Sequence, residues 1–501
     1  MSLVVPSQAR EQAECWCDKA SYTMAVPQYD TIVIGGGVSG LAGALLRARR
    51  GERVAVVEKS AHLSPVLRGF VRRGVHMDSG FHYAGSMGRD GLLRYLVREL
   101  GIAGTFDGVV RTLDTIDRVR FLEPAFDFSF PQGWEALEQE LCDAFPADGP
   151  GLKDFLARVR ALWEQARTAF VRDLGRGPGV FFAAGGSLRE AVDRSTGNPV
   201  VRGLLCSHGI LYGGLAHETS LLFHSQIVGS YYESACLIEG GGPTWAEALE
   251  QALHGADVEL LCDREVSRID LDEGGGFAAV ELRTGERLAS RRCISTMHPK
   301  FLLDMVPTRA FSPAYRRRIR ELQETPSAVV LFGRCPSASF SGNLILANGP
   351  DAVMDWTHLP LEERPLFVSS PLSGAGGGVS VICPATLADV PGTGNSSDRR
   401  RPEGYQDWKM ELAGRLVQRL SRCAGDLVGR FELLDVATPL TFRDRLSSPE
   451  GGLYGIKHRL ADMPLLPRTA VKGLYLSGQA VAAPGVLGAL CAGFLTESCI
   501  V

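Results

Sequence analysis

Three glycines and one acidic residue near the start of the chain have the types and spacing that bind a dinucleotide. Gly35, Gly37 and Gly40 form a G-x-G-x-x-G motif, and Glu58 follows at the end of the next strand-like run. In this motif the first glycine allows a tight turn, the second lets the backbone approach a pyrophosphate, and the third lets a helix pack closely on a strand. A carboxylate such as Glu58 accepts hydrogen bonds from a ribose. The pattern predicts a dinucleotide site and leaves NAD and FAD open; a glycine-rich turn without a ligand is the alternative.

The elements that position these residues form a βαβ unit. Residues 31–34 are mostly β-branched and predict a buried strand, and residues 54–57 predict a second one that ends at Glu58. Between them, residues 41–50 carry apolar side chains at helical spacing. The free N–H groups at the start of this helix would face the phosphates of the ligand.

A second glycine-rich turn near the end of the chain indicates which dinucleotide binds. Residues 473–476 predict a strand, residues 477–479 a turn, and a helix follows from about Gly485. A flavin is long, so its ring needs an anchor away from the adenosine end. The positive end of a helix that starts near Gly485 could face the carbonyl edge of that ring. NAD alone does not require this arrangement, so the two turns together favour FAD.

His82 and Tyr83 are the candidate catalytic residues, because the stretch GFHYAG that contains them returns toward the cofactor. A proton donor or acceptor there would protonate or deprotonate the carbon next to a hydride-transfer position. The alternative is a structural role, with the histidine satisfied by backbone groups in a tight loop. Four more residues in a helical block could line a tunnel, although each alone is more often structural: His208, Tyr212, His217 and His224. Their spacing suits no metal, so no metal site is predicted.

Length and composition are those of a globular protein. The chain has 501 residues, 45% hydrophobic and 22% charged, with a net charge of −4, which suggests two or three domains and no nucleic-acid partner. The 12 cysteines form no C-x-x-C pair and are expected to be free thiols in a reducing compartment; a metal or redox role for Cys15 and Cys17 is the alternative. Residues 473–496 are uncharged and long enough to span a bilayer, but glycine and proline interrupt them, which favours a buried strand-turn-helix.

The pattern along the chain predicts an α/β fold. A Rossmann-like FAD-binding domain, with a parallel sheet plus an antiparallel meander, carries an inserted mixed α/β, partly helical substrate domain. Residues 1–28 are expected to form an N-terminal extension. The FAD-binding domain is assigned to residues 29–87, 236–298 and 445–501, and the substrate-binding domain to residues 88–235 and 299–444.

Four separated blocks of sequence resemble a known family, in the order that the family has them. They are residues 29–60, 78–85, 239–253 and 473–490. Together they resemble the FAD-dependent group of phytoene desaturases, carotenoid isomerases and retinol saturases, within the amine-oxidase-like flavoprotein superfamily. The D-x-G-x-H-Y-x-G block and the S-G-Q ending are closer to the retinol-saturase-like branch. One departure is that Pro65, Val66 and Leu67 precede Arg68, where the family commonly has a glycine pair.

The resemblance implies which residues would contact FAD. At the adenosine half, Glu58 and Lys59 would contact the ribose, and Val266, with Thr296 nearby, the adenine region. Arg68 would lie near the phosphates or the ring. The residues for the pyrophosphate are Gly35, Gly36, Gly37, Val38, Ser39 and Gly40, and those for the far end of the flavin are Gly478, Gln479, Val486 and Gly488.

The resemblance also implies an activity. We expect an FAD-dependent oxidoreductase that saturates, desaturates or isomerises carbon–carbon bonds of a long apolar polyene or isoprenoid, such as a carotenoid, by hydride transfer at flavin N5. The electron donor or acceptor would be NAD(P)H, a quinone or oxygen. One alternative is a flavin amine oxidase acting on a small amine, which the lack of an acidic cluster in residues 185–235 argues against. The other is a non-catalytic flavin-binding scaffold subunit.

The expected location is cytoplasmic, with the option of peripheral contact with a membrane. The simplest interpretation of the run Arg316, Arg317 and Arg318 is a solvated face of a helix. Beside Ile319 and Leu322 they also suit a membrane surface, from which a lipid-soluble substrate would be extracted.

Overall fold

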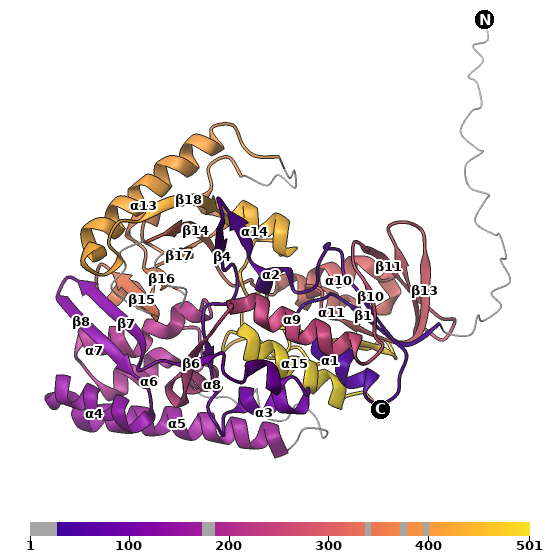
Figure 1. Cartoon of the computed structure of the whole chain (residues 1–501), viewed down its shortest axis with the longest axis horizontal. Helices are drawn as coiled ribbons and strands as arrows, with labels where there is room; N and C mark the ends of the chain where they lie inside the picture. Colours follow the sequence, from indigo (N-terminus) through magenta and orange to yellow (C-terminus); the bar gives the residue numbers. More distant parts are fainter. Residues whose placement is uncertain (1–27, 173–185, 336–341, 371–377, 394–399, 501) are drawn as a thin grey trace, which may run out of the picture.

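Figure 1 shows the fold as a computed structural model. It describes residues 28–172, 186–335, 342–370, 378–393 and 400–500. The predictions made for the N-terminal extension, including Cys15 and Cys17, lie outside the described residues, apart from residue 28.

The first sheet confirms the Rossmann-like prediction. Strands β10, β2, β1, β13 and β19 lie side by side in that order and run parallel. Strand β13 also pairs antiparallel with β12, which pairs with β11, and this is the predicted meander. The bounds are β1 (Tyr29–Ile34), β2 (Val54–Val57), β10 (Glu259–Leu261), β11 (Val266–Leu271), β12 (Phe277–Leu282), β13 (Arg287–Ser295) and β19 (Leu474–Leu476). The parallel part of the sheet and the meander therefore share one long strand, β13.

Helices cover both faces of this sheet, because side chains alternate between the faces along each parallel strand. Val33 and Val56 face a core shared with α1 (Val38–Ala48), α9 (Gly241–His254) and α15 (Gly485–Ser498). Ile32 and Val57 face a second core shared with α10 (Pro299–Met305) and α11 (Pro313–Glu321). Helix α1 begins before residue 41, because the small residues at its start lack the apolar side chains that mark a helix in sequence.

A second sheet of seven strands, β18-β14-β17-β16-β15-β7-β8, forms the other half of the molecule. All neighbours are antiparallel except β15 and β7, which are parallel. The bounds are β7 (Thr115–Leu122), β8 (Ala125–Pro131), β14 (Ser327–Arg334), β15 (Gly342–Ala347), β16 (Leu366–Ser370), β17 (Gly378–Ala385) and β18 (Glu432–Ala437). All seven strands lie within residues 88–235 and 299–444, the ranges expected to form the mixed α/β part of the chain.

Helices pack on both faces of the second sheet as well (Figure 1). On one face, α13 (Tyr405–Val428) packs through Leu412 and Leu416. On the other lie α7 (Pro199–Cys206) and α12 (Pro350–Met354), followed by the layer of α4 (Trp134–Ala144), α5 (Gly149–Arg172), α6 (Leu188–Ser195) and α8 (Leu221–Glu233). The architecture matches the expected fold class, while the assignment of residue ranges to two domains stays a prediction.

Residues 78–85 pass between the two halves. They follow the hairpin of β3 (Phe70–Arg72) and β4 (Val75–Met77), and they end in β5 (Ala84–Gly85). Strand β5 pairs with β9 (Ala235–Ile238), which pairs with β6 (Val110–Thr112). Ser380 on β17 donates a hydrogen bond to the carbonyl of Asp78. The GFHYAG stretch thus joins the small β5-β9-β6 sheet, and the residues just before it are held by β17 of the second sheet.

Within the described ranges, the helices are all too short or too polar to cross a membrane. Helix α15 is buried against α1 instead, where Gly493 packs on Ser39 and Ala42. The expected strand-turn-helix at the end of the chain is confirmed.

Candidate active site

The glycine loop has the tight geometry that its sequence predicts. Gly35 has a φ of +104°, and a side chain there would collide with the hydroxyl of Thr296. A side chain at Gly40 would collide with the carbonyl of Gly35. Gly37 differs from both, because a Cβ there would meet no protein atom within 4 Å. The loop therefore packs tightly underneath and leaves an open space over Gly37, at the start of α1.

Glu58 lies directly under this loop. Its carboxylate is buried and accepts hydrogen bonds from the backbone N–H of Gly36 (2.7 Å) and of Ser60 (2.8 Å). The carbonyl of Glu58 accepts a bond from Arg264 on the way to β11, which begins with the buried Val266. The carboxylate is thus fixed beside the glycine-rich turn.

Two basic residues that the resemblance assigned to the cofactor make other contacts here. Lys59 is exposed, and its amine contacts the hydroxyl of Ser447. Arg68 donates to the carbonyl of Leu63 and forms an ion pair with Glu250 on α9. Their assignment to ribose, phosphates or ring stays a prediction.

Hydrogen bonds join the two glycine-rich turns, although 438 residues separate Ser39 from Ser477. The hydroxyl oxygens of these two serines lie 2.7 Å apart, and the N–H of Gly478 donates to Ser39. Thr496 on α15 also donates to Ser477. Thr296 is bonded to the strand that leads into the first turn, because its hydroxyl donates to the carbonyl of Ile34 (2.9 Å). The structure thus brings together the two ends of the chain that were predicted to share one cofactor.

The start of α15 extends beyond this junction. Gly485 follows Pro484 and has a φ of +80°. The first turn of the helix lines two cavities, which are described below: Val486 lines both of them, and Gly488 lines one. Gln479, in the preceding turn, accepts a hydrogen bond from His458 through its backbone carbonyl (2.9 Å). The N-terminus of α15 therefore borders both cavities, and its role toward a flavin ring stays a prediction.

A large cavity, here called the aromatic cavity, lies between the start of α15 and the second sheet. It holds about 870 Å³ of empty space, counted with its opening. Its walls come from the 80–83 loop, the turn at residues 207–213, strands β14, β16 and β17, and residues 453–454. Six aromatic side chains line it: Phe81, Tyr83, Tyr231, Trp356, Phe367 and Tyr454. Among the described residues on its wall there is no carboxylate, lysine or arginine.

His82 is the titratable imidazole on this wall. Its ring lies edge-on to Phe367 with 5.9 Å between centroids, and no hydrogen bond joins it to another described residue. Burial lowers the pKa of His82 to about 4, so the ring is neutral at pH 7. A neutral imidazole without a protein partner is able to take up or pass on a proton at the cavity surface.

Tyr83 is held by a buried carboxylate that the sequence analysis did not single out. Its hydroxyl donates to Asp117 (2.8 Å), which also accepts from Asn343 (2.9 Å) and bonds His208 (3.0 Å). Tyr232 bonds the other nitrogen of His208 (3.0 Å). Burial, and then Asp117, raise the pKa of Tyr83 well above its usual range, so the hydroxyl keeps its proton.

The signal for Asp117 is present in the sequence. Along β7, Asp117, Val119 and Phe121 occupy alternate positions on the buried face of the strand. A charged residue in phase with apolar ones predicts a buried polar contact. Of the four helical-block residues, His208 joins this network, Tyr212 bonds His224 (2.8 Å), and His217 is exposed.

Residues 38–363 match the sequence family described as flavin containing amine oxidoreductase. The chain belongs to this family. It is therefore a flavin-dependent oxidoreductase and uses FAD, as the sequence analysis expected. The open space over Gly37, the carboxylate beneath it and the helix that starts at Gly485 fit such a cofactor.

Several curated relatives align with most of the chain. The chain is 22% identical to the all-trans-retinol 13,14-reductase of Homo sapiens, over 99% of this chain and 89% of the relative. It is also 22% identical to the enzyme of that name from Danio rerio, over 92% and 84%, and to a Danio rerio protein named inactive all-trans-retinol 13,14-reductase, over 94% and 85%. These relatives support the resemblance to retinol saturases.

Two solved structures show the same fold. An oxidoreductase from Methanosarcina mazei has a TM-score of 0.62 at 17% identity, covering 93% of this chain and 98% of that one. Wild-type putrescine oxidase bound to putrescine has a TM-score of 0.60 at 15% identity, covering 94% and 98%. At these identities the likeness concerns the fold alone.

Proposed function

We propose that the protein reduces a carbon–carbon double bond of a long apolar polyene. The observation that carries the proposal is the aromatic cavity next to the start of α15, which has six aromatic rings and no charged side chain among its described lining residues. Such a cavity suits an apolar substrate and excludes water. The names of the curated relatives support saturation over desaturation and isomerisation, which the sequence left open.

The chain's own residues would hold the cofactor in the following way. The glycine loop and the start of α1 bind the pyrophosphate over Gly37, where the structure leaves room. Glu58 accepts hydrogen bonds from the ribose, and the first turn of α15 faces the ring. The bound FAD supplies hydride transfer at its N5.

His82 supplies the proton that the reduction needs. Addition of hydrogen across a double bond requires a hydride at one carbon and a proton at its neighbour. His82 borders the aromatic cavity and has no hydrogen-bond partner among the described residues, so its ring is free to reach a substrate. Tyr83 is the weaker candidate, because its hydroxyl is committed to Asp117. It instead contributes an aromatic face, with its ring centroid 4.5 Å from that of Tyr231.

An amine oxidase is the second candidate, since putrescine oxidase shares the fold. A cationic amine requires an acceptor or a negative charge in the cavity, and the described walls supply no carboxylate. The test compares two half-reactions of the flavin-loaded protein without oxygen. We expect a polyene to reoxidise the reduced flavin, and an amine to leave the oxidised flavin unbleached. Bleaching by amines together with no response to polyenes would refute the proposal.

The electron donor is proposed to be NAD(P)H or a reduced partner. Rapid bleaching of the flavin by NAD(P)H under anaerobic conditions is the expected result. If NAD(P)H leaves the flavin oxidised while another reductant supports turnover, the donor is a redox partner instead.

Peripheral membrane contact is proposed for the segment at residues 460–466 rather than for the residues first considered. Ile319 and Leu322 are buried, so they cannot touch a membrane. Leu460, Met463 and Leu466 are 43%, 73% and 49% exposed. Arg318 donates to the carbonyl of Met463, which places α11 and its basic residues beside them. We expect co-sedimentation with anionic vesicles that Met463→Ser weakens; unchanged binding by this variant would remove the segment from the contact.

A further inference from the structure

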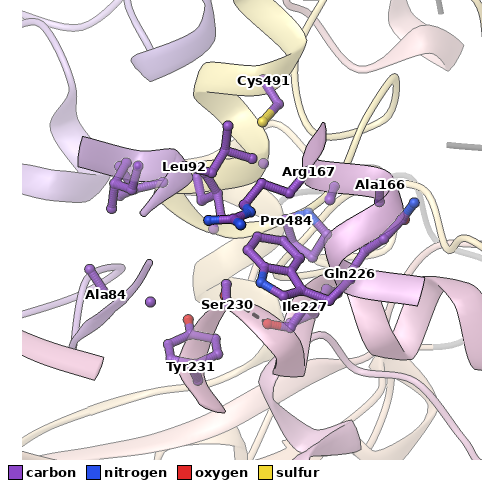
Figure 2. Close-up of a pocket in the computed structure, with 18 of the residues that line it drawn as sticks. Ala84, Leu92, Ala166, Arg167, Gln226, Ile227, Ser230, Tyr231, Pro484 and Cys491 are labelled. Atoms are coloured by element: carbon purple, nitrogen blue, oxygen red, sulfur yellow. Dashed lines mark hydrogen bonds between the residues drawn. The ribbon is translucent and has the colours of Figure 1, made fainter. Parts of the chain in front are cut away.

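A smaller cavity, which holds about 660 Å³ of empty space counted with its opening, adjoins the aromatic cavity. The two share Tyr83, Tyr231, Gly485 and Val486, so they meet at the start of α15. Figure 2 shows the smaller cavity enclosed by side chains of α5 and α8, among them Arg167 and Gln226, and by the turn before α15 at Pro484. The two cavities are therefore neighbours at the start of α15.

Two buried polar side chains on its wall have no hydrogen-bond partner among the described residues. Gln226 on α8 is 7% exposed, and neither its amide nitrogen nor its amide oxygen is bonded. Trp163 on α5 is 3% exposed, and its indole N–H is unbonded. Gly229 lets the two helices approach, because a side chain there would overlap Trp163. Buried groups left unpaired cost free energy, which points to a ligand that pairs them.

The charged side chain on the wall of the smaller cavity, Arg167, is already paired. Arg167 reaches into the space, but it forms an ion pair with Glu233 (3.0 Å) and donates to the carbonyl of Asp90 (3.0 Å). The hydroxyl of Ser230 donates a hydrogen bond to the carbonyl of Ile227 (2.7 Å). What remains to be satisfied is an indole donor and an amide that can both donate and accept.

We propose that this smaller cavity binds a terminal hydroxyl group of the substrate, held by Trp163 and Gln226; the inference rests on the proposed function. A hydroxyl accepts the hydrogen bond of the indole N–H and donates to the amide oxygen, so it uses both groups. An ammonium would leave the indole without an acceptor. A carboxylate would accept from the indole and from the amide NH2 group, but it would bring a negative charge into a cavity where Arg167 is already paired with Glu233. A plain hydrocarbon would leave both residues unsatisfied.

This anchor would also determine where the enzyme reacts. The hydroxyl end is fixed on one side of Tyr83 and Tyr231, and the apolar chain continues on the other side past His82. The distance from the anchor to His82 then selects one double bond. Trp163 and Gln226 are positioning and specificity residues in this account, since they touch the end of the substrate that does not react.

The test is a binding comparison that needs no turnover. Flavin-loaded protein is titrated with all-trans-retinol and with the same polyene carrying a methyl in place of the hydroxymethyl group, and the change in flavin absorbance is followed. We expect the wild type to bind the alcohol at least about tenfold more tightly than the hydrocarbon. Gln226→Leu and Trp163→Phe should each reduce this ratio toward one. Gln251→Leu, the same change at an exposed position of α9, should leave it unchanged.

Thermal unfolding gives a second readout. Gln226→Leu removes two unpaired buried atoms, so without polyene its melting temperature should equal or exceed that of the wild type, and the alcohol should raise it less. A wild-type ratio retained in both variants would overturn the anchor. Loss of FAD from either variant would also overturn it, because the groups would then serve the flavin. If the wild type binds neither polyene, the proposed function itself fails; equal binding of both overturns the anchor alone.

Discussion

The glycine loop and the aromatic cavity differ in what gives them their shape. At the loop, backbone geometry dominates: Gly35 and Gly40 have no room for a side chain, and Glu58 bonds backbone N–H groups. At the cavity, side chains dominate: aromatic rings form the wall, and Asp117 holds one of them from behind. The difference teaches that changes at the loop should act on the cofactor, and changes at the cavity on the substrate.

The strongest test of this separation is His82→Gln. We expect kcat for polyene reduction to fall by about 10²–10⁴-fold, which is the usual contribution of general acid catalysis. FAD should remain bound, because the side chain of His82 makes no hydrogen bond to the glycine loop. Steady-state kinetics and flavin absorbance give the two numbers. His217→Gln, at an exposed histidine, is the control. Loss of flavin from His82→Gln would join the two regions and contradict the comparison.

The pH dependence of the rate sharpens the role of His82. Burial lowers its pKa to about 4, so only a small fraction of the ring is protonated at pH 7, and that fraction grows as the pH falls toward 4. If the protonated ring is the donor, the rate of the chemical step should rise on acidification over this range. Single-turnover reoxidation of the flavin measures it, and His82→Gln should abolish the rise. A wild-type rate that falls steadily between pH 7 and pH 5 would remove His82 as the acid.

Tyr83→Phe tests the buried network behind the cavity. The change leaves Asp117 with one donor fewer, so the free energy of unfolding should fall by about 1–3 kcal/mol. Chemical denaturation measures the loss, and FAD retention should not change. Tyr95→Phe is the control, because no hydrogen bond of its hydroxyl joins it to another described residue. An unchanged free energy of unfolding in Tyr83→Phe would mean that Asp117 does not need this hydrogen bond.

His224 tests burial in the helical layer by its effect on stability. Burial lowers its pKa to about 3, whereas an unfolded histidine titrates near 6.5. The unfolded chain therefore binds the extra proton below pH 6.5, and stability falls as the pH falls. From pH 7 to pH 5 this histidine alone should cost about 2 kcal/mol. Unfolding of His224→Leu should show a loss smaller by that amount; equal slopes would contradict it.

Gly37→Ala has the smallest expected effect and the most local one. A methyl group there meets no protein atom within 4 Å, so the flavin-free protein should unfold as the wild type does, within about 0.5 kcal/mol. It would occupy the space assigned to the pyrophosphate, so the Kd for FAD should rise at least about tenfold, or 1.4 kcal/mol. Fluorescence titration measures this. Gly104→Ala, also unobstructed, should change neither quantity; wild-type FAD affinity in Gly37→Ala would reject the loop assignment.

The two regions also differ in what their sequences reveal. The loop lies in one βαβ unit, where the order of strand, glycines, helix and Glu58 is local, and the spacing alone predicts its geometry. The partner turn at Gly478 could be recognised because it repeats a glycine-rich pattern. The walls of the aromatic cavity come from segments far apart in the chain, and Asn343 reaches Asp117 from 226 residues away. Such contacts depend on the tertiary fold, and neither the network nor the smaller cavity was predicted.

The central claim is that the protein adds two hydrogens to a polyene. The most direct measurement is mass analysis of products after the flavin-loaded protein is reduced and incubated anaerobically with all-trans-retinol. The account predicts a product heavier by the mass of two hydrogens, in an amount that follows the enzyme and disappears in His82→Gln. A product lighter by two hydrogens, an isomer of unchanged mass, or no product beside active deamination of an amine would contradict it.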